Sequence, residues 1–162
     1  MINLSNGLTF EQYLEKSKKE YWDIQIEAYN STNLSLNTKK SLQNSTSTVN
    51  VAVFSEGYCP DCIVTLPFLK RMAEVNKNIN LYFFPKTGYE SFLEEFTGEA
   101  RIPTIITFDC EMNPKGAYVE FPKQLLEKMI PLKIEEKKDL VNDYRQGKYN
   151  SIIEEELLDI IL

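Results

Sequence analysis

Residues 49–69, VNVAVFSEGYCPDCIVTLPFL, decide the fold of this 162-residue chain. The run from Val49 to Phe54 is short, apolar and rich in β-branched side chains, which is typical of a buried strand. Pro60 follows at a position that suits the first turn of a helix. The stretch therefore predicts a strand, a Cys-x-x-Cys motif at Cys59 and Cys62, and a helix in direct succession.

The elements that follow this motif predict a mixed α/β sheet. Apolar residues recur at three- and four-residue steps after Cys62, and a second apolar run, from Asn80 to Phe84, completes a βαβ unit. The remaining core elements are expected at residues 89–96 (helix), 104–108 (strand), 113–116 (turn) and 117–121 (strand). Together these elements predict a central sheet of about four strands flanked by helices.

Helical segments extend the chain at both ends. Thr9 to Gln12 has the form of a capping box, so we expect one helix from about Phe10 to Tyr29, with the single tryptophan, Trp22, in the core. A short helix is expected within the Ser/Thr/Asn-rich connection that follows. Near the C-terminus, helices are expected at residues 123–130, 132–146 and 149–162, with a break at Gly147. We therefore expect one compact domain that consists of an N-terminal helical extension (1–47), an α/β core (48–130) and a C-terminal helical extension (131–162).

Composition narrows the class of protein. The net charge is −6 and acidic and basic residues are interspersed, which disfavours nucleic acid as a partner. No apolar run approaches the ~18 residues of a membrane span, and the N-terminus has no signal pattern, so we expect a cytoplasmic protein without a membrane partner. Three cysteines cannot form a secreted disulfide framework, and structural disulfides are rare in the cytosol. Any disulfide in this chain is therefore expected to be transient.

The two cysteines of the motif differ in their expected roles. A motif between a strand and a helix places Cys59 at the helix N-terminus, where free N–H groups and the helix dipole stabilise a thiolate. Cys62 lies one turn inside the helix, close enough to attack a mixed disulfide formed on Cys59. We therefore expect Cys59 to be the nucleophile and Cys62 to be the resolving cysteine.

Two other interpretations of the pair remain open from the sequence. The first is a pair of inert, buried thiols, and the second is half of a zinc site. Zinc normally takes four ligands, and a chain without histidine would have to add Cys110 and an acidic residue, so we expect no metal. Cys110 itself is expected to be a small packing residue, with a third redox or a regulatory thiol as the alternative.

Several residues beyond Cys-x-x-Cys give the sequence a resemblance to the thioredoxin family. Pro67 matches the kink proline of the family's active-site helix, and Ile102-Pro103-Thr104 matches its Ile-Pro-Thr motif. The resemblance covers about residues 48–130. It implies a thioredoxin-like α/β fold with extra helices at both termini. It also implies a cis peptide bond before Pro103, which would face the cysteines, and a role for Ile102 and Thr104 in holding an extended substrate segment.

The departures from the family pattern concern the acid–base chemistry of the pair. Tyr58 stands where a tryptophan is usual, and Pro60 and Asp61 replace the usual Gly-Pro between the cysteines. The buried aspartate of many thioredoxins falls at Val53, so another base, such as Glu56 or water, would have to accept the proton of the resolving cysteine. We expect the carboxylate of Asp61 to raise the pKa of the nucleophilic cysteine, with a simple helix-stabilising role as the alternative.

These observations favour a thiol–disulfide oxidoreductase that reduces protein disulfides without a metal or an organic cofactor. Its expected partners are a disulfide-containing protein and, as electron donor, a reductase or a low-molecular-weight thiol. The alternative is a binding or adaptor protein with a thioredoxin fold and little redox turnover. The apolar face of the last helix, around Ile153 and Leu157, is expected to pack on the sheet of its own chain, and a homodimer through this helix is the alternative.

Overall fold

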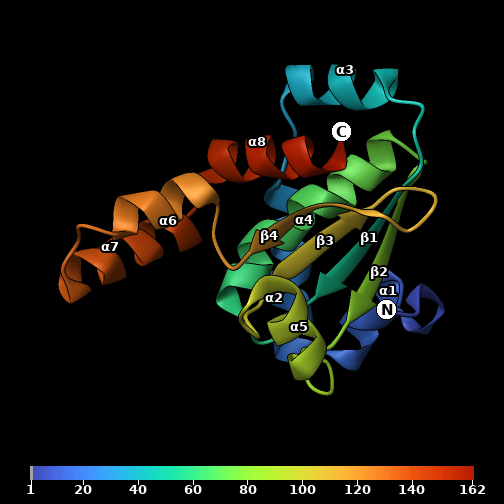
Figure 1. Ribbon diagram of the computed structural model, residues 1–162. Helices are drawn as coiled ribbons and strands as arrows, with labels where there is room; N and C mark the ends of the chain where they lie inside the picture. The colour runs from blue at the N-terminus through green and yellow to red at the C-terminus, as the bar shows by residue number, and fades with distance from the viewer. Residues whose placement is uncertain (1) are drawn as a thin grey trace.

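A four-stranded mixed sheet forms the centre of the structure, a computed structural model that describes residues 2–162 (Figure 1). The strands are β1 (Val49–Phe54), β2 (Ile79–Phe84), β3 (Thr104–Phe108) and β4 (Pro114–Val119), in the spatial order β2-β1-β3-β4. β1 is parallel to β2 and antiparallel to β3, and β3 is antiparallel to β4. The predicted mixed sheet of four strands is confirmed.

Helices cover both faces of this sheet. A 3₁₀ turn, η1 (Leu4–Asn6), comes first, and the α-helices are α1 (Phe10–Lys16), α2 (Lys19–Ser31), α3 (Leu36–Asn44), α4 (Pro60–Val75), α5 (Glu90–Thr97), α6 (Lys123–Met129), α7 (Ile134–Arg145) and α8 (Asn150–Ile161). In Figure 1, α6 and α7 lie to one side of the sheet, while α3 and α8 lie together at one end. The short helix predicted in the polar connection is α3.

Alternation along β1 divides the core into two parts, because successive side chains of a strand point to opposite faces. Val51 and Val53 belong to the larger cluster, which also contains buried residues of α1, α3, α4 and α8. Ala52 and Phe54 belong to a smaller cluster with Leu93 of α5. Every residue of β1 except Asn50 is buried, so the strand that precedes the cysteines is held on both faces.

The N-terminal helical region differs from the prediction of one helix from Phe10 to Tyr29. The chain leaves helical geometry at Ser17, and α2 begins two residues later, at Lys19. The Ser17 hydroxyl donates to the Tyr13 carbonyl at 3.2 Å, a side-chain bond that competes with the helix backbone. A Cβ placed on Gly57 would lie 2.5 Å from the Ser17 hydroxyl oxygen, so this break packs directly on the loop before Cys59.

The break also changes which side of α2 is buried. Trp22 is 40% exposed and Ile24 is 48% exposed, whereas the amide side chain of Gln25 is buried. The prediction that Trp22 packs in the core was wrong. The prediction treated the apolar residues from Phe10 to Ala28 as one face of a single helix. The interruption at Ser17 rotates α2 relative to α1, so this spacing no longer marks the buried side of α2.

The hairpin between β3 and β4 starts earlier than predicted. The Asp109 carboxylate accepts hydrogen bonds from the backbone N–H groups of Glu111 and Asn113, so the tight turn lies at residues 109–113. β4 then begins at Pro114, not at Ala117. Gly147 has φ of +87° between α7 and α8, which confirms the predicted break because glycine tolerates this backbone region.

The apolar face of α8 packs inside the chain. Ile153, Leu157 and Ile161 are almost fully buried, and the Thr107 hydroxyl of β3 donates to the Ile160 carbonyl at 2.7 Å. The backbone N–H of Ser35 donates to the buried Glu154 carboxylate at 2.7 Å, which joins the two ends of the chain. Within residues 2–162, no helix has both the length and the apolar character that crossing a bilayer requires.

Candidate active site

Cys59 and Cys62 lie at the N-terminus of α4, as the sequence predicts. Cys59 is the N-cap residue, and its sulfur accepts the backbone N–H of Cys62 at 3.3 Å. Pro60 occupies the first turn, where its missing N–H removes no helix hydrogen bond. Both cysteines are free and buried, with Cys59 6% exposed and Cys62 0% exposed. The helix continues through Pro67, which lies inside α4.

The Ile102–Pro103 segment faces the nucleophile. Their peptide bond is cis, and the Cys59 thiol donates to the Ile102 carbonyl at 3.8 Å. A backbone hydrogen bond to the residue after β4 holds this segment in place, because the Glu120 N–H donates to the Pro103 carbonyl at 2.7 Å. The half-buried Ile102 therefore lies beside the sulfur of Cys59.

The two thiols have opposite proton affinities. The pKa of Cys59 is lowered, first by a hydrogen bond from the Cys62 side chain and then by backbone N–H groups, while burial and the Asp61 charge oppose the shift. The pKa of Cys62 is raised well above the ordinary value, first by burial and then by the hydrogen bond and charge of Cys59. The geometry thus favours a thiolate on Cys59 and a neutral thiol on Cys62, which is the predicted division of roles.

Asp61 is held by a partner that the sequence did not indicate. Arg145, in the last turn of α7, forms a bidentate ion pair with Asp61, in which its Nε and Nη2 atoms donate to the two carboxylate oxygens at 2.8 and 3.1 Å. The Asp61 side chain is 9% exposed, and that of Arg145 is 40% exposed. Asp61 does push the pKa of Cys59 upward, as expected, but the net shift is downward. The expected effect of Asp61 on Cys59 is therefore confirmed in direction, but the Cys62 and backbone hydrogen bonds outweigh it, so the pKa of Cys59 is lowered overall.

A network of buried hydroxyl groups lies beside the first turns of α4, next to the ion pair of Asp61 and Arg145. The hydroxyl groups of Thr65 on α4, Tyr118 on β4 and Tyr144 on α7 are mutually within 2.7–3.4 Å. All three side chains are fully buried. Together with the neighbouring Arg145, this network fixes the C-terminal extension against the start of α4.

Val53 is fully buried in β1, at the position where the resemblance would place a proton acceptor. The Glu56 carboxylate, suggested as a replacement, accepts the backbone N–H groups of Lys86 and Thr87 at 2.9 and 3.2 Å. It is therefore committed to the loop after β2. The Ser55 hydroxyl, in contrast, lies close enough to Cys62 to lower the pKa of that thiol. Serine after a strand carries no sequence signal for this role.

The remaining predicted site residues separate into exposed and buried ones. Tyr58 is 60% exposed and Pro60 is also exposed, so both contribute to the surface around Cys59. Thr104 is fully buried, and its hydroxyl donates to the Arg101 carbonyl at 2.6 Å. The Thr104 side chain therefore supports the cis-proline loop from inside, and the substrate-binding role of Thr104 stays a prediction.

Cys110 lies away from the pair. It follows β3, whereas Pro103 precedes that strand, so the length of β3 separates Cys110 from the active-site end of the sheet. Its side chain is exposed, which contradicts the expectation of a packing residue. Among residues 2–162, no cluster of three histidine, cysteine or acidic side chains is placed to hold a metal ion.

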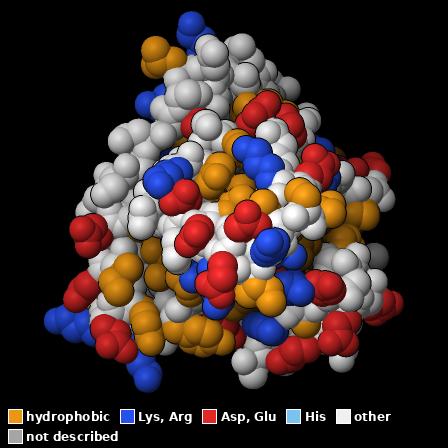
Figure 2. Space-filling model, turned by 90° about the vertical axis from the view of Figure 1, so that its left-hand side faces the viewer, with side chains coloured by type: hydrophobic (Ala, Val, Ile, Leu, Met, Phe, Trp, Pro, Cys, Tyr) orange, Lys and Arg blue, Asp and Glu red, His pale blue; other side chains and the backbone are white. Residues whose placement is uncertain are grey.

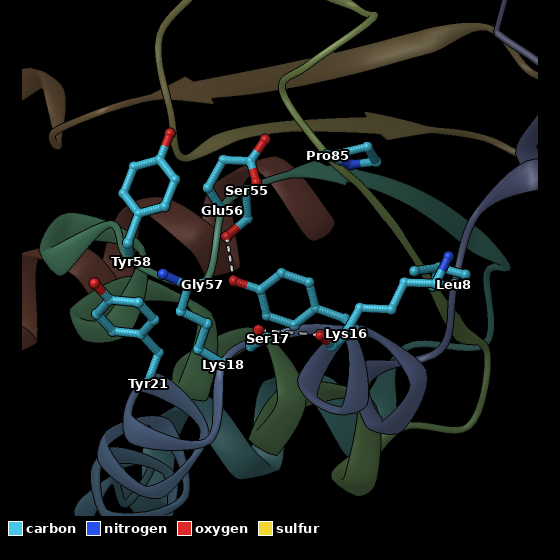
Figure 3. A pocket seen from close by; sticks show the side chains of 11 residues that line it. Leu8, Lys16, Ser17, Lys18, Tyr21, Ser55, Glu56, Gly57, Tyr58 and Pro85 are labelled. Carbon is cyan, nitrogen blue, oxygen red and sulfur yellow. Dashed lines mark hydrogen bonds between the residues drawn. The ribbon is translucent and has the colours of Figure 1, made fainter.

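A pocket of about 310 Å³ opens beside the loop that carries the cysteines (Figure 3). Figure 3 shows Tyr21 and Tyr58 at one end of it and Leu8 and Pro85 at the other. Ser55 and Tyr13 also line it, and their hydroxyl groups are 2.7 Å apart. The helical break at residue 17 thus creates a pocket between the N-terminal helices and the motif.

The surface on the side of α6 and α7 is mixed in character. Figure 2 shows acidic and basic side chains interspersed across this face, with hydrophobic side chains between them. Ile130 and Ile134 are 79% and 72% exposed at the junction of α6 and α7. No single charge sign dominates the view.

The four-stranded fold and the pair Cys59–Cys62 together indicate the thioredoxin class of proteins, and comparison with known sequences agrees with this class. The sequence pattern of the thioredoxin family matches residues 7–138, so the chain belongs to that family. The match is wider than the 48–130 region that the motifs indicate and includes the N-terminal helices. No curated protein sequence is significantly similar to this chain.

Two solved structures share the fold over nearly the whole chain. A protein of unknown function from Pseudomonas aeruginosa is 22% identical, with a TM-score of 0.83, and the match covers 98% of this chain and 93% of that one. An HIV epitope scaffold is 21% identical, with a TM-score of 0.82, over 98% of this chain and 94% of that one. Both matches include the helical extensions, so these helices belong to a fold that recurs.

Proposed function

We propose that this protein reduces disulfide bonds in other proteins by dithiol exchange. The observation that carries the proposal is the position of the Cys59 sulfur, which caps α4, accepts the Cys62 N–H at 3.3 Å and lies beside the Ile102 carbonyl. A thiolate at a helix N-terminus, with a second thiol one turn away, is the arrangement that disulfide exchange requires.

The reaction proceeds in two exchanges. In the first, the Cys59 thiolate attacks one sulfur of the substrate disulfide, and the other substrate sulfur leaves as a thiolate. In the second, Cys62 loses its proton and attacks the Cys59 sulfur, which breaks the mixed disulfide and releases the second substrate thiolate. The substrate gains two electrons and the protein is left with a Cys59–Cys62 disulfide. Each substrate thiolate takes a proton from water.

The surroundings of Cys59 supply the substrate contacts. The backbone of Ile102, next to Pro103, orients an extended substrate segment across the sulfur. The exposed ring of Tyr58 and the exposed Pro60 border the same site. A cytoplasmic reductase or a low-molecular-weight thiol returns the protein to its dithiol form, and no metal or organic cofactor takes part.

The test is a coupled disulfide-reduction assay with the variants Cys59→Ser, Cys62→Ser and Cys110→Ser. Cys59→Ser is expected to abolish turnover, whereas Cys110→Ser keeps it and serves as the matched control, because Cys110 is an exposed cysteine of the same chain. Cys62→Ser is expected to accumulate a mixed disulfide on Cys59, which mass spectrometry detects and which identifies the substrate. Turnover that is indifferent to Cys59→Ser would rule out this function and favour a binding or adaptor role.

A further inference from the structure

The buried resolving cysteine needs a route for its proton. Cys62 is fully buried, and burial and the neighbouring Cys59 raise its pKa, so at neutral pH it holds the proton that it must lose before attack. The position of the usual buried carboxylate is occupied by Val53, and the Glu56 carboxylate binds the N–H groups of the loop after β2. The route must therefore pass through another group.

The Ser55 hydroxyl is the polar group next to Cys62. Ser55 is 1% exposed and directly follows β1, and its hydroxyl lies close enough to Cys62 to lower the pKa of that thiol. On its other side, the Ser55 oxygen is 2.7 Å from the Tyr13 hydroxyl, within the buried interior. The three groups thus form a continuous line from the sulfur of Cys62 to α1.

The Tyr13 end of this line borders the pocket beside the cysteine loop. Tyr13 and Ser55 both line the 310 Å³ pocket, and their hydroxyl groups are 2.7 Å apart. The Gln25 side chain of α2 lies close enough to Tyr13 to lower the pKa of its hydroxyl, and its amide donates to the Gly57 carbonyl at 3.4 Å. Gln25 is 3% exposed, so a buried amide holds both the tyrosine and the cysteine loop in place.

We propose that Ser55 and Tyr13 relay the proton of Cys62 to water in this pocket during the second exchange. As Cys62 attacks, its proton passes to the Ser55 oxygen, the Ser55 proton passes to the Tyr13 oxygen, and the Tyr13 proton passes to a pocket water. Both hydroxyl groups end as they began, so the relay needs no base in the interior. The inference rests on the proposed function and gives the N-terminal helices a part in it.

The electrostatic surroundings agree with a neutral relay. Burial raises the pKa of Tyr13, so the phenol stays protonated and passes a proton on without accumulating charge. Cys59 is the ionisable group in direct contact with this end of α4, the Tyr58 and Tyr144 phenols feel the charge of Cys62, and Asp61 precedes Cys62 in the chain. The carboxylate among them, Asp61, is bound by Arg145, so it is occupied as an acceptor.

The experiment follows the two exchanges separately. The reduced protein is mixed with excess 5,5′-dithiobis(2-nitrobenzoate) in a stopped-flow instrument, in a Cys110→Ser background so that the exposed third thiol does not react. The first nitrothiobenzoate released reports attack by Cys59, and the second reports resolution by Cys62. The variants are Ser55→Ala and Tyr13→Phe. Tyr118→Phe is the matched control, because it removes a fully buried tyrosine hydroxyl from the other network.

The second release is expected to slow by about a hundredfold in Tyr13→Phe and Ser55→Ala, at the low end of the range for lost proton-transfer assistance, while the first release is unchanged. The deficit is expected to shrink as the pH rises, because hydroxide then removes the proton without the relay. Tyr118→Phe is expected to leave both releases unchanged.

The relay is overturned if the second release is unchanged in both variants, if Tyr118→Phe slows it equally, or if the deficit does not depend on pH. Failure of the relay leaves the first release intact. Failure of the proposed function instead appears as a first release that persists in Cys59→Ser. The two failures are therefore distinguishable in the same experiment.

Discussion

The ion pair between Asp61 and Arg145 gives a prediction about both stability and reactivity. Arg145→Gln leaves the Asp61 carboxylate, only 9% exposed, without its cation. Removing one partner of a fully buried ion pair costs about 3–5 kcal/mol, whereas an exposed pair contributes about 0–1 kcal/mol. Because the Arg145 side chain is 40% exposed, the expected loss lies between these limits. We expect a loss of about 2 kcal/mol, which lowers Tm by about 4–8 °C for a chain of this size.

Arg145→Gln is also expected to change the pKa of the nucleophile, Cys59. Without the guanidinium, the negative charge of Asp61 acts more strongly on the Cys59 thiolate, so the pKa of Cys59 rises. Asp61→Asn has the opposite effect, because it removes the carboxylate and leaves the cation of Arg145 near the sulfur. Both changes are measured on the reduced protein, by urea unfolding and by titration of thiolate absorbance.

Lys148→Gln is the control for this prediction, because it breaks the exposed ion pair with Asp143 close to the end of α7. It is expected to change stability by less than about 1 kcal/mol. The double variant Asp61→Asn/Arg145→Gln should lose less stability than the sum of the single variants, because the first change removes the unpaired charge. The reasoning is refuted if Arg145→Gln is no more destabilising than Lys148→Gln, or if it lowers the pKa of Cys59.

Two further predictions concern pH and packing. The pKa of Cys59 is lowered in the folded protein, whereas an ordinary thiol in the unfolded chain titrates at about 8.5. Between these two pKa values the unfolded chain binds more protons than the folded one, so the stability of the reduced protein should increase as pH rises through this window. Above this window, the raised pKa of Cys62 reverses the trend, so stability falls as pH rises further. Urea midpoints measured across pH should show no such gain in stability for Cys59→Ser. An equal gain in Cys59→Ser would contradict the assignment of the lowered pKa to Cys59. Gly116→Ala places a Cβ 2.9 Å from the Ile160 side chain, so we expect a loss of about 1–3 kcal/mol in urea unfolding. The loss should be smaller when Ile160→Ala is also present, and additive losses would speak against this contact.

Much of the fold could be predicted because its signals are local. The β-branched run of β1, the proline at the start of α4 and the glycine between α7 and α8 act through backbone geometry within a few residues. Where local signals competed, the prediction failed, as at Ser17, whose side chain ends α1 within an otherwise helical pattern. Trp22 was misplaced for the same reason, because its side of α2 depends on that break.

The sequence by itself determined the chemistry of the site, and the tertiary structure decided its surroundings. A thiol at a helix N-terminus and a second thiol one turn later follow from the spacing of Cys59 and Cys62, because helix geometry is periodic. The partners of these groups are separated from them by long stretches of chain, as Arg145 is from Asp61. Contacts of this kind depend on how complete helices pack against each other, which no short pattern records. The net proton affinity of each cysteine is therefore a property of the folded chain.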